Sequence, residues 1–392
     1  MGGARLGRPL VALAATAALL APDVALSSHV PKPVWKPRLS VTSRDPVYVD
    51  LFRGGRGFVL QLRSGAPDFT RPPRPFFYTT ADYGRTWTKQ DPPEGAYVAD
   101  FASPSTGYVF TTDQAGREIL RTTDGGDTWT ALPDRPVDAN GADSAGAYFD
   151  VMSAPSERKL VLGGIVSRYY AECNWQSRIA VYSSEDGGAS FTWVELPYDG
   201  VVHQLEMLDE DHGVMLASEW TRTNDPVTCS SEGESARLRA LVTHDRGASW
   251  APFADEPFDF ESSPSQMGVH SVGIASPDRL LLGMMNGDVL TSHDGGATFV
   301  RAEGTENPAQ PASDPYSLRR IEAIEFATPD VGYATSAHGA AWRTDDGGLT
   351  WRLERALQAG GDYSFSSGLA VATPRRAIVA AHTKLSSRIP PH

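Results

Sequence analysis

The sequence predicts an all-β fold built from a repeated four-stranded unit, and three observations support this prediction. First, one eight-residue pattern recurs six times between residues 80 and 351. Second, no stretch keeps an amphipathic helical period for ten residues, whereas short β-patterned runs precede and follow the repeats. Third, the 392 residues include 37 Gly and 29 Pro, as expected for a chain that turns often.

The repeated pattern reads Ser/Thr, any residue, Asp, any residue, Gly, any residue, Ser/Thr, aromatic. The carboxylate can accept hydrogen bonds from backbone N–H groups a few residues on, and the glycine supplies a conformation that other residues resist. The hydroxyls add local bonds, and the aromatic ring has the size to fill the space between neighbouring sheets. We therefore interpret the aspartates as structural. They are Asp82, Asp124, Asp186, Asp245, Asp294 and Asp346.

The six copies resemble the Asp-box, or BNR, repeat of sialidase-like β-propellers. Consecutive aspartates lie 42 to 62 residues apart, and one four-stranded blade needs roughly 40–50 residues. In its single-propeller organisation the chain is most similar to the photosystem II stability/assembly factor-like group. The resemblance implies that each box joins the third and fourth strands of a blade, on the face away from the binding site.

We predict a single propeller of seven four-stranded blades, with six blades as the alternative. After the last box, Ser366–Thr373 and Arg376–Thr383 have the pattern of two further strands. Two strands alone would leave an open edge that invites pairing. The N-terminal segment Val34–Thr42 is expected to complete this sheet, so that both termini close the last blade.

Residues 1–27 are predicted to be a secretory signal peptide, and residues 28–392 the propeller. Arg5 and Arg8 precede the apolar run Leu10–Leu20, which is too short to span a bilayer, and Ala25-Leu26-Ser27 fits a cleavage site. We therefore expect a secreted bacterial protein without a membrane span. The net charge of −13 argues against nucleic acid as a partner, because nucleic acid selects basic surfaces.

Long segments between the second and third strands predict the functional face, because long loops on a rigid scaffold are where binding usually takes place. Aromatic side chains there suit sugar rings and protein partners alike, although they would equally serve to pack the loops together. The only two cysteines, Cys173 and Cys229, lie in equivalent loops of adjacent blades, and export favours a disulfide between them. The candidate ligand-binding residues of these loops are Arg71, Arg74, Tyr169, Tyr170, Trp175, Trp220 and Arg222.

The inner strands carry two aligned sets of polar residues that are expected to face the central channel. The first set is acidic, and the second lies three residues earlier in each strand. They have two interpretations: convergence on a ligand or ion, or hydrogen bonds to neighbouring strands and buried water. The first set is Asp50, Asp100, Glu206 and Glu325, and the second is Tyr97, Tyr148, His203, His270 and Glu322.

The predicted function is a non-catalytic propeller that binds a protein or glycan through its long-loop face, without cofactor or metal and as a monomer. The alternative is a divergent glycoside hydrolase. It would use Glu206 or Glu325 as the acid, with Tyr97 or Tyr148 and with Arg320 for an anionic sugar. The first substrate arginine of sialidases lies in an Arg-Ile-Pro motif before the first box, but here Arg388-Ile389-Pro390 follows the last one.

Overall fold

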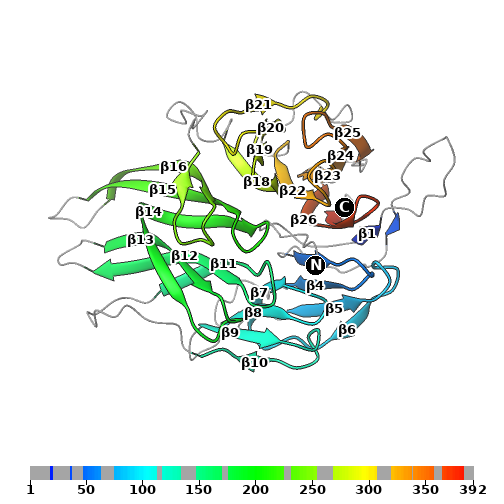
Figure 1. Ribbon diagram of the computed structural model, residues 1–392, viewed down its shortest axis with the longest axis horizontal. Coiled ribbons are helices and arrows are strands. Elements are labelled where there is room, and N and C mark those ends of the chain that lie inside the picture. The colour runs from blue at the N-terminus through cyan, green and yellow to red at the C-terminus, as the bar shows by residue number, and fades with distance from the viewer. Residues whose placement is uncertain are drawn as a thin grey trace, which may run out of the picture.

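The computed structural model describes twelve stretches of the chain, and all regular structure in them is β (Figure 1). The described residues are 18–20, 36–37, 47–62, 75–112, 117–133, 147–169, 175–224, 231–253, 268–306, 319–337, 339–356 and 364–383. Their strands form five four-stranded sheets and one seven-stranded sheet, and every strand pair is antiparallel.

Four of the four-stranded sheets use strands that are consecutive in the sequence, each pairing with the next. The first consists of β3 (Val47–Leu51), β4 (Gly57–Gln61), β5 (Phe76–Thr80) and β6 (Thr88–Gln90), and the second of β7 (Ala96–Phe101), β8 (Gly107–Thr112), β9 (Arg117–Thr122) and β10 (Thr130–Ala131). The other two consist of β18 (Val269–Ser276), β19 (Arg279–Met284), β20 (Val289–Ser292) and β21 (Val300–Arg301), and of β22 (Ile321–Phe326), β23 (Gly332–Ser336), β24 (Ala340–Thr344) and β25 (Arg352–Ala356).

The seven-stranded sheet is continuous because one long strand belongs to both of its halves. The first half of β14 pairs with β13 as far as Asp199, and the second half pairs with β15 from Gly200 onward. The strands are β11 (Ala147–Ser153), β12 (Leu160–Tyr169), β13 (Trp175–Ser184), β14 (Thr192–Met207), β15 (Gly213–Asn224), β16 (Ser231–Thr243) and β17 (Ala251–Pro252).

The remaining sheet joins the two ends of the chain in the order β2-β1-β27-β26. Its two C-terminal strands are β26 (Ser364–Thr373) and β27 (Arg376–Thr383). They have the bounds expected from the sequence, apart from two residues at the start of β26. The N-terminal contribution differs from the expectation. The strand next to β27 is β1 (Ala18–Leu20), within the predicted leader, and the expected segment Val34–Thr42 supplies only the outer strand β2 (Lys36–Pro37).

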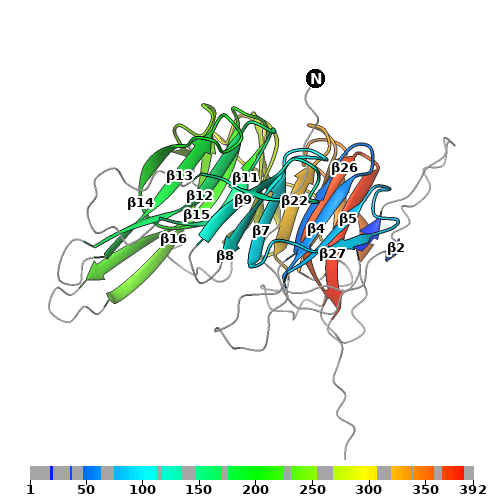
Figure 2. The same cartoon turned by 90° about the horizontal axis from the view of Figure 1, so that it is seen from below.

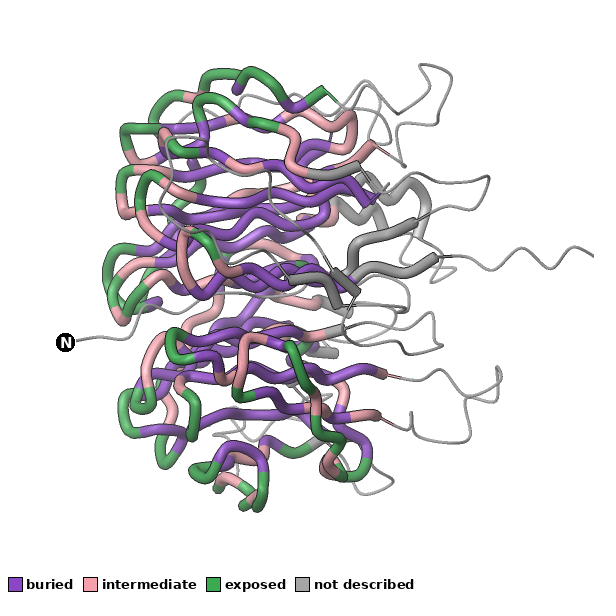
Figure 3. The backbone as a smooth tube through the Cα atoms, turned by 90° about the vertical axis from the view of Figure 1, so that its right-hand side faces the viewer, coloured by how far each residue is buried: buried purple, intermediate pink, exposed green. Residues whose placement is uncertain are grey.

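The sheets form a β-propeller, in which the first strand of each unit lies nearest the centre (Figure 1). These inner strands contact one another in succession, β3 with β7, β7 with β11, β11 with β14, β14 with β18, β18 with β22 and β22 with β26, and β26 returns to β3. Apolar residues fill the space between the sheets, and exposed residues gather at the turns at one end of them (Figure 3).

The aromatic residue that ends each repeat helps to join neighbouring sheets. Trp129 packs edge-on against Phe77 and Phe101, with ring centroids 6.2 and 6.1 Å away. Phe77 belongs to the preceding sheet, so this contact crosses the interface between sheets. Gly126 is required at the same place, because its φ is +96° and an added Cβ would lie 2.5 Å from the Phe77 ring.

The six repeats form one turn, which we call the aspartate turn, with the same hydrogen bonds each time. The first hydroxyl donates to Asp Oδ1 over 2.7–2.9 Å and accepts from the amides of the aspartate and of the later glycine. The Ser/Thr four residues after the aspartate donates its amide to Oδ1 and its hydroxyl to Oδ2. The turn therefore satisfies most of its own polar groups, and the amide after the aspartate donates to a carbonyl in the turn between the first and second strands.

Each aspartate turn places two successive residues in the left-handed region, and in two turns the first of them is not glycine. These exceptions are Tyr83, with φ of 59°, and Arg246, with φ of 68°. Such backbone costs on the order of 1–2 kcal/mol in L-residues. Both side chains make contacts that offset this cost: the Tyr83 hydroxyl accepts a hydrogen bond from the amide of Gly54 at 3.1 Å, and Arg246 enters an ionic cluster.

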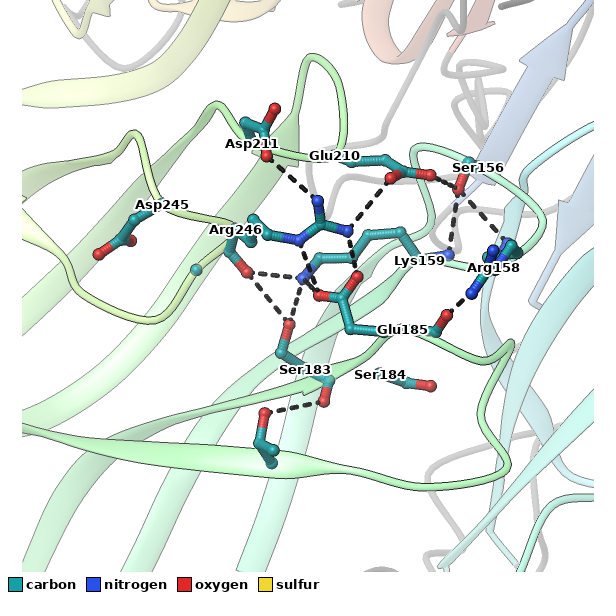
Figure 4. A network of polar contacts seen from close by, with 12 residues as sticks. Ser156, Arg158, Lys159, Ser183, Ser184, Glu185, Glu210, Asp211, Asp245 and Arg246 are labelled. Atoms are coloured by element: carbon teal, nitrogen blue, oxygen red, sulfur yellow. Dashed lines mark hydrogen bonds and ion pairs between the residues drawn. The ribbon is translucent and has the colours of Figure 1, made fainter.

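The cluster around Arg246 joins four turns of the seven-stranded sheet (Figure 4). The Arg246 guanidinium pairs with Glu185, Glu210 and Asp211. Its backbone carbonyl accepts a hydrogen bond at 2.6 Å from Nζ of Lys159, a side chain that is 1% exposed and that also pairs with Glu185. Burial lowers the pKa of Lys159, while the Glu185 carboxylate favours its charged form.

The aspartate turns predict a loss of stability in acid. Hydrogen bonds from the following Ser/Thr hydroxyl and amide lower the pKa of Asp124, Asp186 and Asp294 to about 2. Because the unfolded chain binds these protons more readily, the stabilisation is complete above pH 4 and is lost as the pH falls toward 2.

Urea unfolding between pH 2 and 7 measures this effect. We expect Asp124→Asn to be less stable than wild type at pH 7 and to lose less stability on acidification. The exposed Asp91 serves as the control position. An Asp124→Asn profile parallel to that of wild type would contradict the prediction.

Candidate functional site: long hairpins and inner-strand bulges

Two hairpins of the seven-stranded sheet are much longer than their counterparts in the other sheets. Strands β12 and β13 have 10 residues each, and β15 and β16 have 12 and 13, whereas the second and third strands of the four consecutive-strand sheets have four to six. Their pairing continues to Tyr169↔Trp175 and Asn224↔Ser231. In Figure 2 the green hairpin of β15 and β16 extends beyond the neighbouring sheets.

The hairpin tips lie at the end of the sheet opposite the aspartate turns. Strand β13 runs from Trp175 near the tip to Ser184, which begins an aspartate turn, and β16 runs in the same way from Ser231 to Thr243. We call the tip end the long-hairpin face. The strands that reach it are anchored by the core at their other ends, so the face rests on a rigid support.

Ion pairs surround the point where β14 passes from one half of the sheet to the other. Arg178 pairs with Asp199 at 3.2 Å, and Arg239 pairs with Glu219 at 2.6 Å. The Arg239 guanidinium also lies 5.0 Å from the centre of the Tyr198 ring. These partly buried pairs neutralise the charges at the base of the two hairpins.

The structure places only part of the residue set predicted for this face. Trp220 is partly buried on β15, opposite Ala236. Three others lie on the extended strands, where their backbone but not their side chain is described: Tyr169, Trp175 and Arg222. Five lie outside the described residues, so their predicted roles remain predictions: Arg71, Arg74, Tyr170, Cys173 and Cys229.

A second group of candidates lies on β-bulges of the inner strands. In five inner strands, the register of pairing with the second strand shifts around a residue with a polar side chain. Bulges turn a side chain away from its regular direction and are common beside functional sites. The bulge residues are Tyr97, Asp150, His203, His270 and Glu322.

One member of this set corrects the sequence alignment. Tyr148 was expected to be equivalent to Tyr97, but it pairs regularly with Ile165, and the bulge of β11 falls at Asp150. Sequence spacing from the turn placed the equivalent residue two positions too early. Ser153 follows Asp150 by three residues, just as Asp100 follows Tyr97. This spacing is the sequence signal that gives the correct alignment.

Three of the bulge residues, Tyr97, His270 and Glu322, form contacts between neighbouring inner strands. His270 on β18 pairs with Glu322 on β22 at 3.1 Å, and Arg320 Nε donates to the other oxygen of this carboxylate at 2.7 Å. Glu322 is 1% exposed, and its carboxyl group is therefore buried between the Arg320 guanidinium and the His270 ring. The Tyr97 hydroxyl donates to the carbonyl of Phe149 on β11 at 3.2 Å.

His203 occupies the bulge of β14 and lies 2.5 Å from the Ser218 hydroxyl through Nε2. Part of its ring keeps contact with solvent. The surrounding protein atoms nevertheless lower the pKa of His203 by desolvation, and the neighbouring His270 lowers it further. His203 is therefore held in its neutral form more strongly than a free histidine.

Two of the aligned acids hold neighbouring sheets together, because each accepts a hydrogen bond from a backbone amide of the next sheet. Asp50 Oδ2 accepts from the amide of Phe101 at 3.1 Å, and Asp100 Oδ2 accepts from the amide of Ala154 at 2.7 Å. Ser153 repeats the contact in the next sheet, because its hydroxyl accepts from the amide of Met207 at 3.0 Å. These contacts agree with the structural interpretation given to the set above.

Glu206 and Glu325, the candidate acids of the hydrolase alternative, occupy the same register as Asp50 and Asp100. Each faces a residue eight positions later on the second strand. Glu325 is 3% exposed and Glu206 is partly buried. Within the described stretches, no group of three or more His, Cys, Asp or Glu side chains is placed to hold a metal ion.

Comparisons with known proteins give the fold and no family. No family model matches the chain, and neither does any curated protein sequence. Among solved structures, "YCF48 bound to D1 peptide" matches with a TM-score of 0.51 and 15% identity, covering 85% of this chain and 89% of that one.

YCF48 from Cyanidioschyzon merolae has a TM-score of 0.49 and 14% identity, covering 86% and 95% of the two chains. The GH74 xyloglucanase from Xanthomonas campestris has a TM-score of 0.48 and 13% identity, covering 79% of this chain and 53% of that one. At these identities the likeness is one of fold alone. Among the described residues there is no helix long and apolar enough to cross a membrane.

The hydrogen bond from the Ala154 amide to Asp100 predicts that Asp100 stabilises the interface between the second sheet and β11. Its carboxylate is 2% exposed, and Asp100→Ala would leave the buried Ala154 amide without this acceptor. We expect a loss of about 1–3 kcal/mol in the free energy of unfolding, measured by urea denaturation. The exposed Asp91→Ala is the matched control. Equal stability of the two variants would contradict the stabilising role of the Asp100 hydrogen bond.

The environment of His203 predicts that stability falls as the pH drops below 6.5. Its folded-state pKa is lowered, so below pH 6.5 the unfolded chain binds a proton that the folded chain resists. Urea midpoints at pH 7.5 and 5.5 should differ more in wild type than in His203→Asn. The exposed His244→Asn is the control, and an unchanged pH dependence in His203→Asn would exclude this residue as the cause.

Proposed function

We propose that this protein is a secreted, non-catalytic β-propeller that binds a protein or glycan partner through its long-hairpin face. The observation that carries the proposal is the length of the β12–β13 and β15–β16 hairpins. Ring closure requires only the inner part of each sheet, as the short strands of the other sheets illustrate. Additional strand length that reaches away from the core is of use for contact with another molecule.

The composition of the hairpins supports recognition. Tyr169, Trp175 and Trp220 lie on the extended strands, and large rigid aromatics contribute strongly to protein and sugar binding. The propeller fold is compatible with a protein partner, since the solved YCF48 structure of similar fold is bound to a peptide. A glycan partner fits the same aromatic residues.

The arrangement of the hydrolase candidates favours the non-catalytic interpretation. Arg320, the arginine nominated for an anionic sugar, bonds to Glu322, and Glu325 is almost fully buried. A hydrolase needs a carboxyl group within reach of the scissile bond and a partner carboxylate or nucleophile beside it. Glu206 is the candidate that keeps solvent contact.

We also infer seven blades of the Asp-box class. Seven inner strands succeed one another around the ring, and the seven-stranded sheet divides into two four-stranded halves that share β14. The repeated aspartate turns join the third and fourth strands, as the resemblance to Asp-box propellers implies. Export with removal of residues 1–27 completes the proposal, giving a mature chain that begins near Ser28.

Site-directed photo-crosslinking tests the binding face. A photoreactive residue at position 175 or 220 of the secreted protein should crosslink to a partner in the native medium or envelope, whereas one at Leu349 should not. Leu349 is the matched control because it is an apolar residue, 40% exposed, in an aspartate turn at the opposite end.

The identified partner is then titrated against purified wild type, Trp175→Ala/Trp220→Ala and Leu349→Ala, with a glycan array run in parallel. We expect affinity to fall at least tenfold, about 1.4 kcal/mol, in the double variant only. Equal binding by all three proteins would place the site elsewhere. Turnover of fluorogenic glycosides that disappears in Glu206→Gln would favour the hydrolase instead.

A further inference from the structure

The β15–β16 hairpin rises above the neighbouring β18–β21 sheet. Counted from the pair that contains the first residue of the aspartate turn, the β19–β20 pairing ends after three further pairs, at Gly283↔Val289, and the turn 285–288 closes the hairpin. The equivalent residue of β15 is Leu216, and its strand continues to pair with β16 for eight more residues, to Asn224. With a rise of about 3.4 Å per residue, the taller hairpin overhangs the shorter one by roughly 25 Å.

The side of the overhang that faces the shorter sheet carries known residues. Leu216 packs in the same apolar cluster as Met284 of β19, so it faces the β18–β21 sheet. Side chains two residues apart lie on the same face of a strand, and Ser218 and Trp220 therefore continue this face above the level where the β19–β20 pairing ends. Leu238, which pairs with Ser218 on β16, is partly buried against the same cluster. Trp220 is likewise only partly buried.

Two histidines lie at the inner end of this face. His203 of β14 is exposed, and its Nε2 is 2.5 Å from the Ser218 hydroxyl. Surrounding protein atoms nevertheless lower its pKa by desolvation, so its ring has solvent on one side and protein on the others. His270 of β18, whose side chain is 25% exposed, lies near enough to lower this pKa further. We call His203, Ser218, Trp220, Leu238 and His270 the hairpin step.

The ionisable side chains around the hairpin step bond to one another. Each pair joins an arginine to a carboxyl group, and one of them lies at the turn 285–288. The pairs are Arg239–Glu219, Arg320–Glu322 and Arg301–Asp288. Within the step, Ser218, Trp220 and Leu238 are uncharged, and desolvation favours the neutral form of His203. A ligand here therefore meets apolar surface and neutral hydrogen-bonding groups.

We propose that the hairpin step binds an uncharged sugar ring of a glycan. A pyranose combines an apolar C–H face with a rim of hydroxyl groups. The C–H face would lie against Trp220 and Leu238, as sugars do on aromatic side chains, and the hydroxyls would bond to His203 and Ser218, which can both donate and accept. The inference rests on the proposed function, because it assigns a ligand class to one side of the long-hairpin face.

A glycan array with the purified secreted protein tests the ligand class. The array carries neutral oligosaccharides of glucose, mannose, xylose and galactose beside counterparts that contain uronic or sialic acid. We expect binding to members of the neutral set. The neutral oligosaccharide bound best is then titrated calorimetrically, free in solution, against wild type and the variants below.

The variants separate the aromatic contact from the polar one. Trp220→Ala should weaken binding about tenfold or more, and Trp220→Phe should recover most of the loss because it keeps an aromatic face. Ser218→Ala should weaken binding about two- to tenfold through the lost hydrogen bond. Leu349→Ala, at the opposite end of the propeller, is the control and should bind like wild type. If urea unfolding shows that Trp220→Ala does not fold, the comparison of Ser218→Ala with Leu349→Ala decides.

Three results would overturn the inference. One is wild-type affinity in both Trp220→Ala and Ser218→Ala, which would place the sugar elsewhere. Another is binding to acidic glycans only. The third is no glycan binding while a photoreactive residue at position 220 captures a protein. That result would keep the proposed binding face and replace the sugar with a protein segment, whereas silence on the array and no crosslink at position 175 or 220 would defeat the proposed function as well.

Discussion

The hydrogen bonding of the aspartate turns is the constraint on which the rest of the structure depends. One carboxylate and two hydroxyls satisfy most polar groups of a tight reversal, and the amide that follows the aspartate donates to a carbonyl in the turn between the first and second strands. Each turn therefore fixes where the third strand of a unit ends and where the fourth begins. It also places the final aromatic residue against the adjacent sheet, as Trp129 contacts Phe77. Local chemistry and packing between sheets are thus set by the same eight residues.

The turns alone would not close a ring, because they act at one end of the sheets only. Closure also requires contacts near the inner strands, where Asp50 and Asp100 each accept a backbone amide from the next sheet. Ser153 on β11 likewise accepts the amide of Met207 on β14, the inner strand that follows it. The Gln204 side chain continues the series by exchanging two hydrogen bonds with Val272. Side chains whose sequence pattern suggests a ligand site therefore stabilise the ring. The polar side chains of the inner strands that reach solvent are bulge residues such as His203.

The proposed separation between a structural end and a binding end of the propeller follows from this arrangement. The end with the aspartate turns is stabilised by local networks, including the Lys159–Glu185–Arg246 cluster. The opposite end is free to vary in length, because strand pairing can continue outward without altering the core. The long β12–β13 and β15–β16 hairpins use that freedom, and they lie next to each other because β14 connects their halves of one sheet.

The sequence by itself determined the all-β class, the number and place of the aspartate turns and the position of most strands, because these depend on residues close together in the chain. It also located Asp50 and Asp100, whose equivalence follows from short shared turns. Only the tertiary structure decided which residues meet across sheets. A bulge moved the relevant position in β11 from Tyr148 to Asp150, and the partnership of His270 with Glu322 joins strands 52 residues apart. The strand beside β27 was likewise decided by a contact between the two ends of the chain, because an edge accepts any segment that supplies matching backbone groups, and local sequence does not specify which one arrives.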